Sequence, residues 1–197
     1  KTDAGHIELL GQSIDGRGVA ERARAGIGRS YQVTSVIGAF TVLENVILAV
    51  QGCLGHAYHF WQPARQTAAL VQRADAVIEL IGLTAQRDTP AAVLAYGQQR
   101  QLEMAMALAM QPRVLLLDEP MAGMGPVESA QIVALLQRLK GQYGILLIEH
   151  DMDAVFALAD RISVLFHGKV IYCGDPATVR EHPMVREAYL GDEEIPA

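Results

Sequence analysis

The chain has 197 residues, of which 51% are hydrophobic and 19% charged, a composition typical of one folded domain or of a domain with a small subdomain. The net charge of −6 leaves no electrostatic footprint for general nucleic-acid binding, and no apolar run approaches the length of a membrane span. Cys53 and Cys173 are too few and too far apart for a disulfide framework or a zinc motif. The residues from Lys1 to His6 lead into no apolar stretch, so no signal peptide is predicted.

The first elements are short. His6–Leu10 is typical of a strand and turn, Val19–Ala25 of a short helix, and Gly26–Gln32 of a strand that ends in a polar residue. Thr41, followed three positions later by Glu44, matches the capping-box pattern. We therefore expect a helix to begin directly after Thr41.

A loop is expected from Gly52 to Pro63, and it contains His56, His59 and Trp61. Two histidines at this spacing need further metal ligands, and the sequence offers none that can be placed. The pattern favours an exposed contact surface over a metal site.

Two helices with apolar faces are predicted next, broken by Gly82 and by the turn residues before Pro90. The first spans Arg65–Ile81, and the second begins at the stretch Leu94–Arg100. Their predicted buried faces are Val71, Ala74, Ile78 and Ile81, and Leu102, Ala105, Met106 and Ala109.

The start of the second helix carries a glycine, Gly97, in the stretch Leu94–Arg100. A glycine lets the backbone approach a ligand closely, and the amides and dipole of a helix N-terminus favour an anion such as phosphate. The alternative is an ordinary helix N-terminus that happens to contain glycine.

The apolar run Val114–Leu117 leads directly into Asp118, Glu119 and Pro120. Such a run suits a strand of a parallel sheet buried on both faces, and its carboxyl end is where open α/β sheets bind ligands. Two carboxylates at this place would hold a magnesium ion and activate a water. A strand followed by a solvated acidic turn is the alternative.

The remaining elements alternate helix and strand, and then form a hairpin. The strand Gly144–Ile148 ends in Glu149-His150-Asp151. The predicted segments are a glycine-containing loop at Met121–Pro126, a helix to Lys140, a helix at Asp151–Ala159, a hairpin of Ile162–Phe166 and Val170–Cys173, and a helix starting at Asp175-Pro176.

Five stretches occur in the order and context of one known family: Gln32, Leu94–Arg100, Val114–Pro120, Ile148–Met152 and Ala188–Gly191. On these motifs the whole chain resembles ATP-binding-cassette ATPases, and in particular the ATP-binding subunits of bacterial branched-chain amino-acid importers. The resemblance implies an α/β, P-loop-NTPase-like, mostly parallel core sheet with flanking helices, an inserted helical subdomain and a small antiparallel part. It divides the chain into core residues 1–32, a helical subdomain 33–111 with the signature motif, and core residues 112–197.

The same resemblance implies ATP and Mg²⁺ as ligands and gives roles to single residues. Asp118 and Gln32 would hold the metal, Glu119 would be the general base, and His150 would contact the γ-phosphate and the attacking water. The signature residues would complete the site of a second subunit by facing its γ-phosphate; they are Ala95, Tyr96, Gly97 and Gln98. The chemistry would be phosphoryl transfer to water, in which positioning and charge stabilisation dominate.

The partners implied by the resemblance are a head-to-tail copy or paralogue and transmembrane permease subunits, at the cytoplasmic face of the bacterial membrane, with no nucleic acid. Three features depart from the family pattern. The 197 residues contain no Gly-x-x-x-x-Gly-Lys-Ser/Thr phosphate loop, Ala95 replaces the usual serine, and Gly125 replaces a common aspartate. The chain therefore resembles a cassette ATPase without its N-terminal part, and we expect it to be inactive alone. A non-transport cassette ATPase and a non-catalytic interaction module are the alternative functions.

Overall fold

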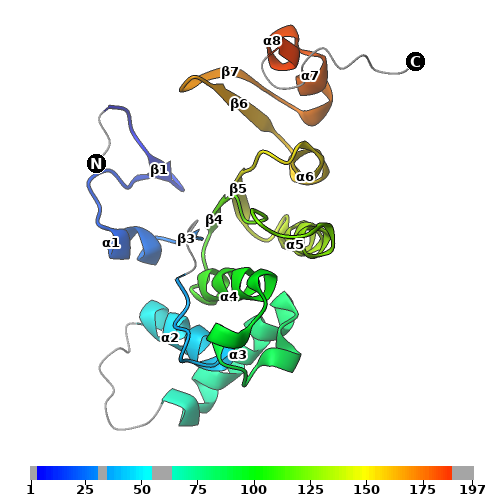
Figure 1. Ribbon diagram of the computed structural model, residues 1–197. Helices are drawn as coiled ribbons and strands as arrows, with labels where there is room; N and C mark the ends of the chain where they lie inside the picture. Colours follow the sequence, from blue (N-terminus) through cyan, green and yellow to red (C-terminus); the bar gives the residue numbers. More distant parts are fainter. Residues whose placement is uncertain (1–3, 31–34, 55–63, 188–197) are drawn as a thin grey trace. The chain divides into compact units, whose positions relative to one another are not determined.

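The computed structural model describes residues 4–30, 35–54 and 64–187 (Figure 1). The chain forms two compact units, Lys1–Ile148 and Glu149–Ala197. No helix among the described residues is both long and apolar enough to cross a membrane. Gln32, the loop residues His56, His59 and Trp61, and the motif at 188–191 lie outside the described residues.

The first unit contains a small hairpin, a parallel sheet and the longer helices. Its elements in chain order are β1 Glu8–Leu9, β2 Gln12–Ser13, α1 Val19–Arg24, β3 Ile27–Arg29, α2 Val42–Leu54, η1 Ala64–Gln66, α3 Ala68–Ile81, η2 Thr84–Gln86, η3 Ala91–Val93, α4 Tyr96–Ala109, β4 Val114–Asp118, α5 Pro126–Leu139 and β5 Gly144–Ile148.

The sheet that positions the acidic motif has the strand order β3-β4-β5, and all its strands are parallel. Ile27 pairs with Val114, and Asp118 pairs with Ile148. Parallel strands need crossover connections, and here the helices between the strands provide them. The predicted parallel α/β core is therefore confirmed.

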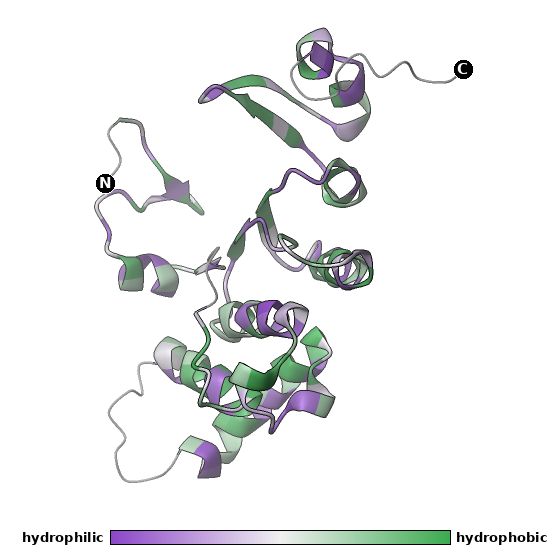
Figure 2. Ribbon diagram, in the orientation of Figure 1, coloured by the Kyte–Doolittle hydropathy of each residue, from purple (hydrophilic) through white to green (hydrophobic). Residues whose placement is uncertain are grey.

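The neighbouring strands β4 and β5 have five residues each and are apolar apart from Asp118 at the end of β4 (Figure 2), but they differ in burial. Leu115 and Leu117 of β4 are fully buried, whereas Leu146 and Ile148 of β5 are 58% and 55% exposed. A strand at the edge of the described sheet need not be covered on both faces. Exposed and half-buried residues therefore alternate along β5, although its sequence is apolar.

Three helices pack together in the first unit, because α2, α3 and α4 contact one another and α4 also contacts β3. The predicted capping box is confirmed: the Thr41 amide donates to Glu44 Oε2 at 2.8 Å, and the Glu44 amide donates to Thr41 Oγ1 at 3.2 Å. Gly82 ends α3 in the left-handed conformation, with φ 86°.

The predicted buried faces of α3 and α4 need correction. Helix α3 begins three residues later than expected, after a short 3-10 turn, and buries Leu70 in preference to Val71. Helix α4 buries Met104 fully and Met106 only partly. Because α4 is covered by helices and by β3, its buried surface is wider than the single stripe that a 3.6-residue period predicts.

The second unit is a hairpin with short helices, as predicted. Its elements are α6 Met152–Leu158, β6 Ile162–Phe166, β7 Lys169–Gly174, α7 Pro176–Glu181 and α8 Pro183–Val185. His167 and Gly168 form the hairpin turn with positive φ angles, and β6 pairs antiparallel with β7. The core of this unit consists of Ile162, Val164, Val179 and Val185.

The division into residues 1–32, 33–111 and 112–197 stays a prediction.

Candidate functional site

The acidic motif lies at the carboxyl end of β4. Asp118 is the last residue of the strand, and its side chain is 35% exposed. Arg29, at the end of the neighbouring strand β3, places its Nη2 3.9 Å from Asp118 Oδ2. That distance is too long for a hydrogen bond, so the guanidinium attracts the carboxylate only through its charge, and the carboxylate stays partly exposed.

Glu119 has a backbone conformation that non-glycine residues seldom adopt. Its φ is 46°, in the left-handed region, where a Cβ costs about 1–2 kcal/mol. The Glu119 amide donates to the carbonyl oxygen of Ile148 at 2.9 Å, so the neighbouring strand β5 fixes the turn. The chain therefore leaves β4 through a strained residue directly after Asp118, and such strain is concentrated at functional sites.

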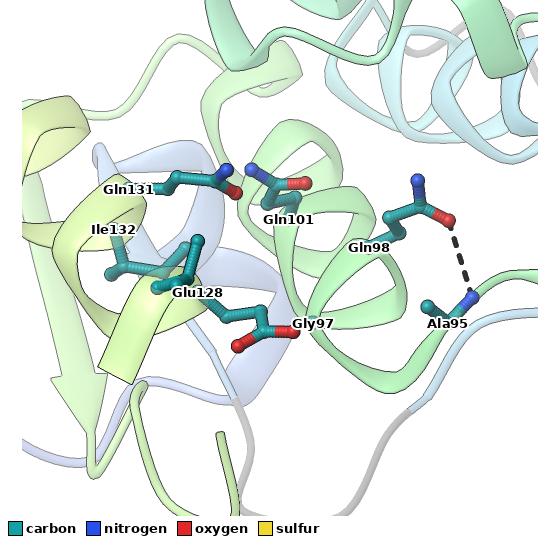
Figure 3. A pocket seen from close by; sticks show the side chains of 8 residues that line it. Ala95, Gly97, Gln98, Gln101, Glu128, Gln131 and Ile132 are labelled. Atoms are coloured by element: carbon teal, nitrogen blue, oxygen red, sulfur yellow. Dashed lines mark hydrogen bonds between the residues drawn. The ribbon is translucent and has the colours of Figure 1, made fainter. Parts of the chain in front are cut away.

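The start of α4 is held by side chains of its own first turn. The Ala95 amide donates to Gln98 Oε1 at 3.2 Å (Figure 3), which is the glutamine half of a capping box. Gln99 Nε2 donates to the carbonyl oxygens of Ala91 and Leu94, both at 3.2 Å. The predicted glycine, Gly97, lies in this ordered first turn of a helix 14 residues long.

Gly97 lies against Glu128 of α5, and a side chain at this position would meet it (Figure 3). A Cβ on Gly97 would be 3.1 Å from Glu128 Cγ. The residue before Gly97 is Tyr96, and its ring faces the loop after β4, because a Cβ on Gly123 would be 3.4 Å from Tyr96 Cε1. The glycine is therefore needed for packing, and the helix start lies beside the loop that follows the carboxylates.

A cavity of about 170 Å³ lies between the first turns of α4 and α5 (Figure 3). Its lining includes three predicted signature residues, Ala95, Gly97 and Gln98, together with Glu128 and Gln131 of α5. The structure thus forms a small hollow at the signature motif, and neither Asp118 nor Glu119 lines it.

His150 belongs to the second unit and precedes α6. Its side chain is 73% exposed, and its amide donates to Glu149 Oε2 at 3.0 Å. Asp151 caps α6 by accepting from the amides of Asp153 and Ala154 at 3.0 and 3.2 Å. Local contacts therefore hold the backbone around His150, and its exposed ring places Nδ1 3.8 Å from Glu149 Oε2.

Several residues around these motifs were not found from the sequence. Arg100 and Glu103 are buried in α4 and form an ion pair of 3.0 Å, and Glu128 packs on Gly97. The signal for the pair was two opposite charges spaced i, i+3 in the helix, the second of them within its apolar half. No local signal indicated Glu128, because its partner lies 31 positions away in sequence.

Comparisons with known proteins give a consistent result. A family profile described as "ABC transporter" matches residues 1–122, and one described as "Branched-chain amino acid ATP-binding cassette transporter" matches residues 169–195. The high-affinity branched-chain amino acid transport ATP-binding protein BraF of Pseudomonas aeruginosa is 36% identical over 195 residues, which cover 95% of this chain and 76% of BraF.

Two further similarities extend this result. The lipopolysaccharide export system ATP-binding protein LptB of Acidithiobacillus ferridurans is 34% identical over 194 residues, covering 98% of this chain and 76% of LptB. Among solved structures, an ATP-binding cassette of an ABC transporter in its ADP conformation matches with a TM-score of 0.81 and 28% identity, over 96% of this chain and 78% of that one. The chain therefore belongs to the ABC transporter family, as an ATP-binding protein of its branched-chain amino acid group.

Proposed function

We propose that this ATP-binding subunit hydrolyses ATP to drive the uptake of branched-chain amino acids through a membrane permease, from the cytoplasmic face of the membrane. The observation that carries the proposal is the pair at the end of β4, in which Asp118 ends the strand and Glu119 follows with a left-handed backbone. The similarity to BraF supports branched-chain amino acids as the solute.

The residues present fit a magnesium ion that takes most of its ligands from elsewhere. No group of three His, Cys, Asp or Glu side chains among the described residues could hold a metal alone. Mg²⁺ in phosphate sites is held through one or two carboxylates, and water and phosphate oxygens complete its shell. The partly exposed carboxylate of Asp118 meets that need, and Gln32 is the second proposed ligand. The ion would neutralise the charge that develops on the phosphate oxygens.

Glu119 has the complementary task. It orients a water for attack on the γ-phosphate and accepts a proton at its carboxylate, the usual action of a general base. The bond from its amide to Ile148 fixes where the side chain begins, so the base is positioned by two strands. His150, with its exposed ring, is proposed to contact the γ-phosphate and the same water.

The signature residues are proposed to act on the nucleotide of a second subunit, a copy or a paralogue, in a head-to-tail dimer. The N-terminus of α4 presents the positive end of a long helix, which favours a phosphate. Ala95 has no hydroxyl that could contact the phosphate. The contacts would therefore come from the backbone amides of Tyr96, Gly97 and Gln98. Residues 33–111 would form the helical subdomain that contacts the permease.

Glu119→Gln is the direct test of the proposed base. The variant is made in a chain extended at its N-terminus by a phosphate-loop segment, since the 197 residues contain no such motif. Loss of the base should lower ATP turnover about 100-fold or more while ATP binding persists and a closed dimer accumulates. Glu79→Gln, an exposed glutamate of α3, is the matched control and should leave turnover unchanged. Normal turnover of Glu119→Gln would show that Glu119 is not the base.

The 197-residue chain itself gives a second test. Without a phosphate loop it has neither the backbone cradle nor the lysine that hold the phosphates, so we expect no magnesium-dependent ATP turnover. Turnover by the purified chain would contradict this expectation.

Lipopolysaccharide export is the second candidate function, because LptB is nearly as similar to this chain as BraF is. The permease that copurifies with the chain distinguishes the two.

A further inference from the structure

Helix α4 contains a buried pair of opposite charges, one turn after the signature residues. Arg100 and Glu103 are 5% and 6% exposed, and Arg100 Nη1 lies 3.0 Å from Glu103 Oε2. Charged side chains are seldom buried so completely, and an apolar pair of similar size often stabilises a helix equally well. The pair therefore needs an explanation other than the stability of α4.

Both members of the pair also bond to groups beyond each other. The second oxygen of Glu103, Oε1, accepts a hydrogen bond of 2.6 Å from the backbone amide of Ser35, 68 positions earlier in the chain. At the other end, Nε and Nη2 of Arg100 donate to the hydroxyl of Tyr96 at 3.2 and 2.9 Å.

The surroundings of Arg100 keep its guanidinium charged. Burial disfavours the charged guanidinium, but the hydrogen bonds to Tyr96 and to Glu103 outweigh it, and the pKa of Arg100 lies above its ordinary value. Hydrogen bonds that involve charged groups are stronger than neutral ones, and low local polarity strengthens them further. The network is consequently a stiff connection.

Tyr96 extends the connection to the loop after β4. Its ring faces Gly123, where a Cβ would be 3.4 Å from Cε1, and Gly123 has a φ of 75°. A continuous path of contacts thus runs from Gly123 through Tyr96, Arg100 and Glu103 to the amide of Ser35.

We propose that Tyr96, Arg100 and Glu103 are positioning residues that form a strut between the start of α4 and the chain at Ser35. A displacement of the signature turn moves Tyr96, and the strut carries the displacement to Ser35. The consequence for catalysis rests on the proposed function, because Gln32, the proposed metal ligand, stands three residues before Ser35 in the sequence. A local staple of α4 is the competing explanation, and it predicts no effect of Tyr96 on Ser35.

Hydrogen–deuterium exchange of the Ser35 amide tests the strut directly, in the 197-residue chain without nucleotide. Tyr96→Phe removes one hydroxyl that does not touch Ser35. We expect exchange at Ser35 to become about fivefold faster or more, because Arg100 loses its acceptor and Glu103 is held less firmly. Glu103→Gln should accelerate it about tenfold or more, by weakening both bonds of the carboxylate.

Two controls separate the strut from general loosening. Tyr172→Phe removes a tyrosine hydroxyl that bonds Thr178 in the second unit, and it should not change exchange at Ser35. Ser35→Ala removes only a marginal 3.5 Å contact to Glu103 and should also leave its amide protected. The amide of Leu108, in the last turns of α4, reports global opening and should exchange equally in wild type and in Tyr96→Phe.

Two outcomes would overturn the strut. Unchanged exchange at Ser35 in Tyr96→Phe, with faster exchange in Glu103→Gln, would reduce the pair to a local staple. Equal acceleration at Ser35 and Leu108 would show general destabilisation. The measurement needs no ATP, so inactivity of the Glu119 site leaves this result unaffected, and failure of the strut leaves the assignment of Glu119 intact.

Discussion

The two units hold their polar groups in different ways. In the first unit, Glu103 and Ser35 bond across 68 positions of sequence, and the carboxylate is buried. In the second unit, the hydrogen bonds of Asp151, Asp175 and Cys173 span at most 12 positions and lie mainly at the surface. Long-range buried bonds depend on the whole unit being folded, whereas local exposed bonds contribute small, separate amounts. Substitutions in the two units should therefore differ in size and in additivity.

Breaking the buried pair should have the largest effect. Glu103→Ala leaves the Arg100 charge buried without its partner, and we expect the free energy of unfolding to fall by about 3–5 kcal/mol. Urea unfolding measures the change. The double variant Arg100→Met, Glu103→Leu removes both charges and should lie closer to the wild type. If Glu103→Ala lowered the free energy of unfolding by less than about 1 kcal/mol, the pair would contribute no more than an exposed salt bridge does.

The close packing of α4 on α5 should give the next largest effect. In Gly97→Ala the new methyl group lies 3.1 Å from Glu128 Cγ, so the Glu128 side chain must move by a few tenths of an ångström, and we expect a cost of about 1–3 kcal/mol. Glu128→Ala should relieve most of this cost, and a double-mutant cycle measures the coupling.

Gly52→Ala in α2 is the matched control for the Gly97 substitution. A Cβ at Gly52 meets no atom within 4 Å, so alanine there should stabilise the protein by about 0.5–1 kcal/mol through helix propensity. Equal effects of the two substitutions would mean that packing on Glu128 is unimportant.

The same contrast explains how much the sequence revealed. The main helices and strands, the parallel core and the caps of α2 and α7 follow from local patterns, because the groups that decide them are a few residues apart. The roles of Gln32, Asp118, Glu119 and His150 came from the order of motifs and remain predictions. The strut could not be predicted, since nothing in the sequence near Ser35 indicates that its amide bonds to Glu103.

Burial was predicted less well for a related reason. Hydrophobic periodicity indicates one face of a helix or strand, but not which further elements cover the others. Helix α4 is buried more widely than its period predicts, and the edge strand β5 less widely than its composition predicts. Both differences arise from tertiary neighbours that a local window does not contain.

The local caps of the second unit should show a smaller effect than the substitutions in α4. Asp151→Ala removes the acceptor for two amides of α6, and we expect a loss of about 1 kcal/mol. Asp175→Ala at α7 should cost a similar amount, since Asp175 bonds Ala177 and Thr178 in the same way. Thermal unfolding measures both, and the two losses should add, because each cap acts on its own helix. Clear non-additivity would show that the second unit is as tightly coupled as the first.

The thiol of Cys173 should show the smallest effect, a change in pH dependence without a change in stability. The Ser163 hydroxyl at 3.2 Å and then the Arg161 guanidinium at 3.1 Å stabilise the thiolate, so the pKa of Cys173 lies below its ordinary value of 9.0. Because the thiolate is the nucleophile, alkylation of Cys173 by iodoacetamide should reach half its maximal rate below pH 9.0. Mass spectrometry measures the alkylation of Cys53 on a separate peptide, so its rate serves as the internal comparison for the rate of Cys173.

Removing the Ser163 hydroxyl tests the sign of this shift. Ser163→Ala destabilises the thiolate, so the pKa should rise, alkylation at neutral pH should slow, and the rates of variant and wild type should converge at high pH, where both thiols are ionised. High salt should weaken the contribution of Arg161, because the contact is exposed and a charge in solvent is screened, while the Ser163 hydrogen bond persists. If salt left the rate of the Ser163→Ala variant unchanged, Arg161 would not act through its charge. We therefore expect salt to change the alkylation rate of Cys173 and to leave the amide exchange rate of Ser35 unchanged. The reason is that the charge of Arg161 lies at the surface, whereas the charge of Glu103 lies inside a packed unit.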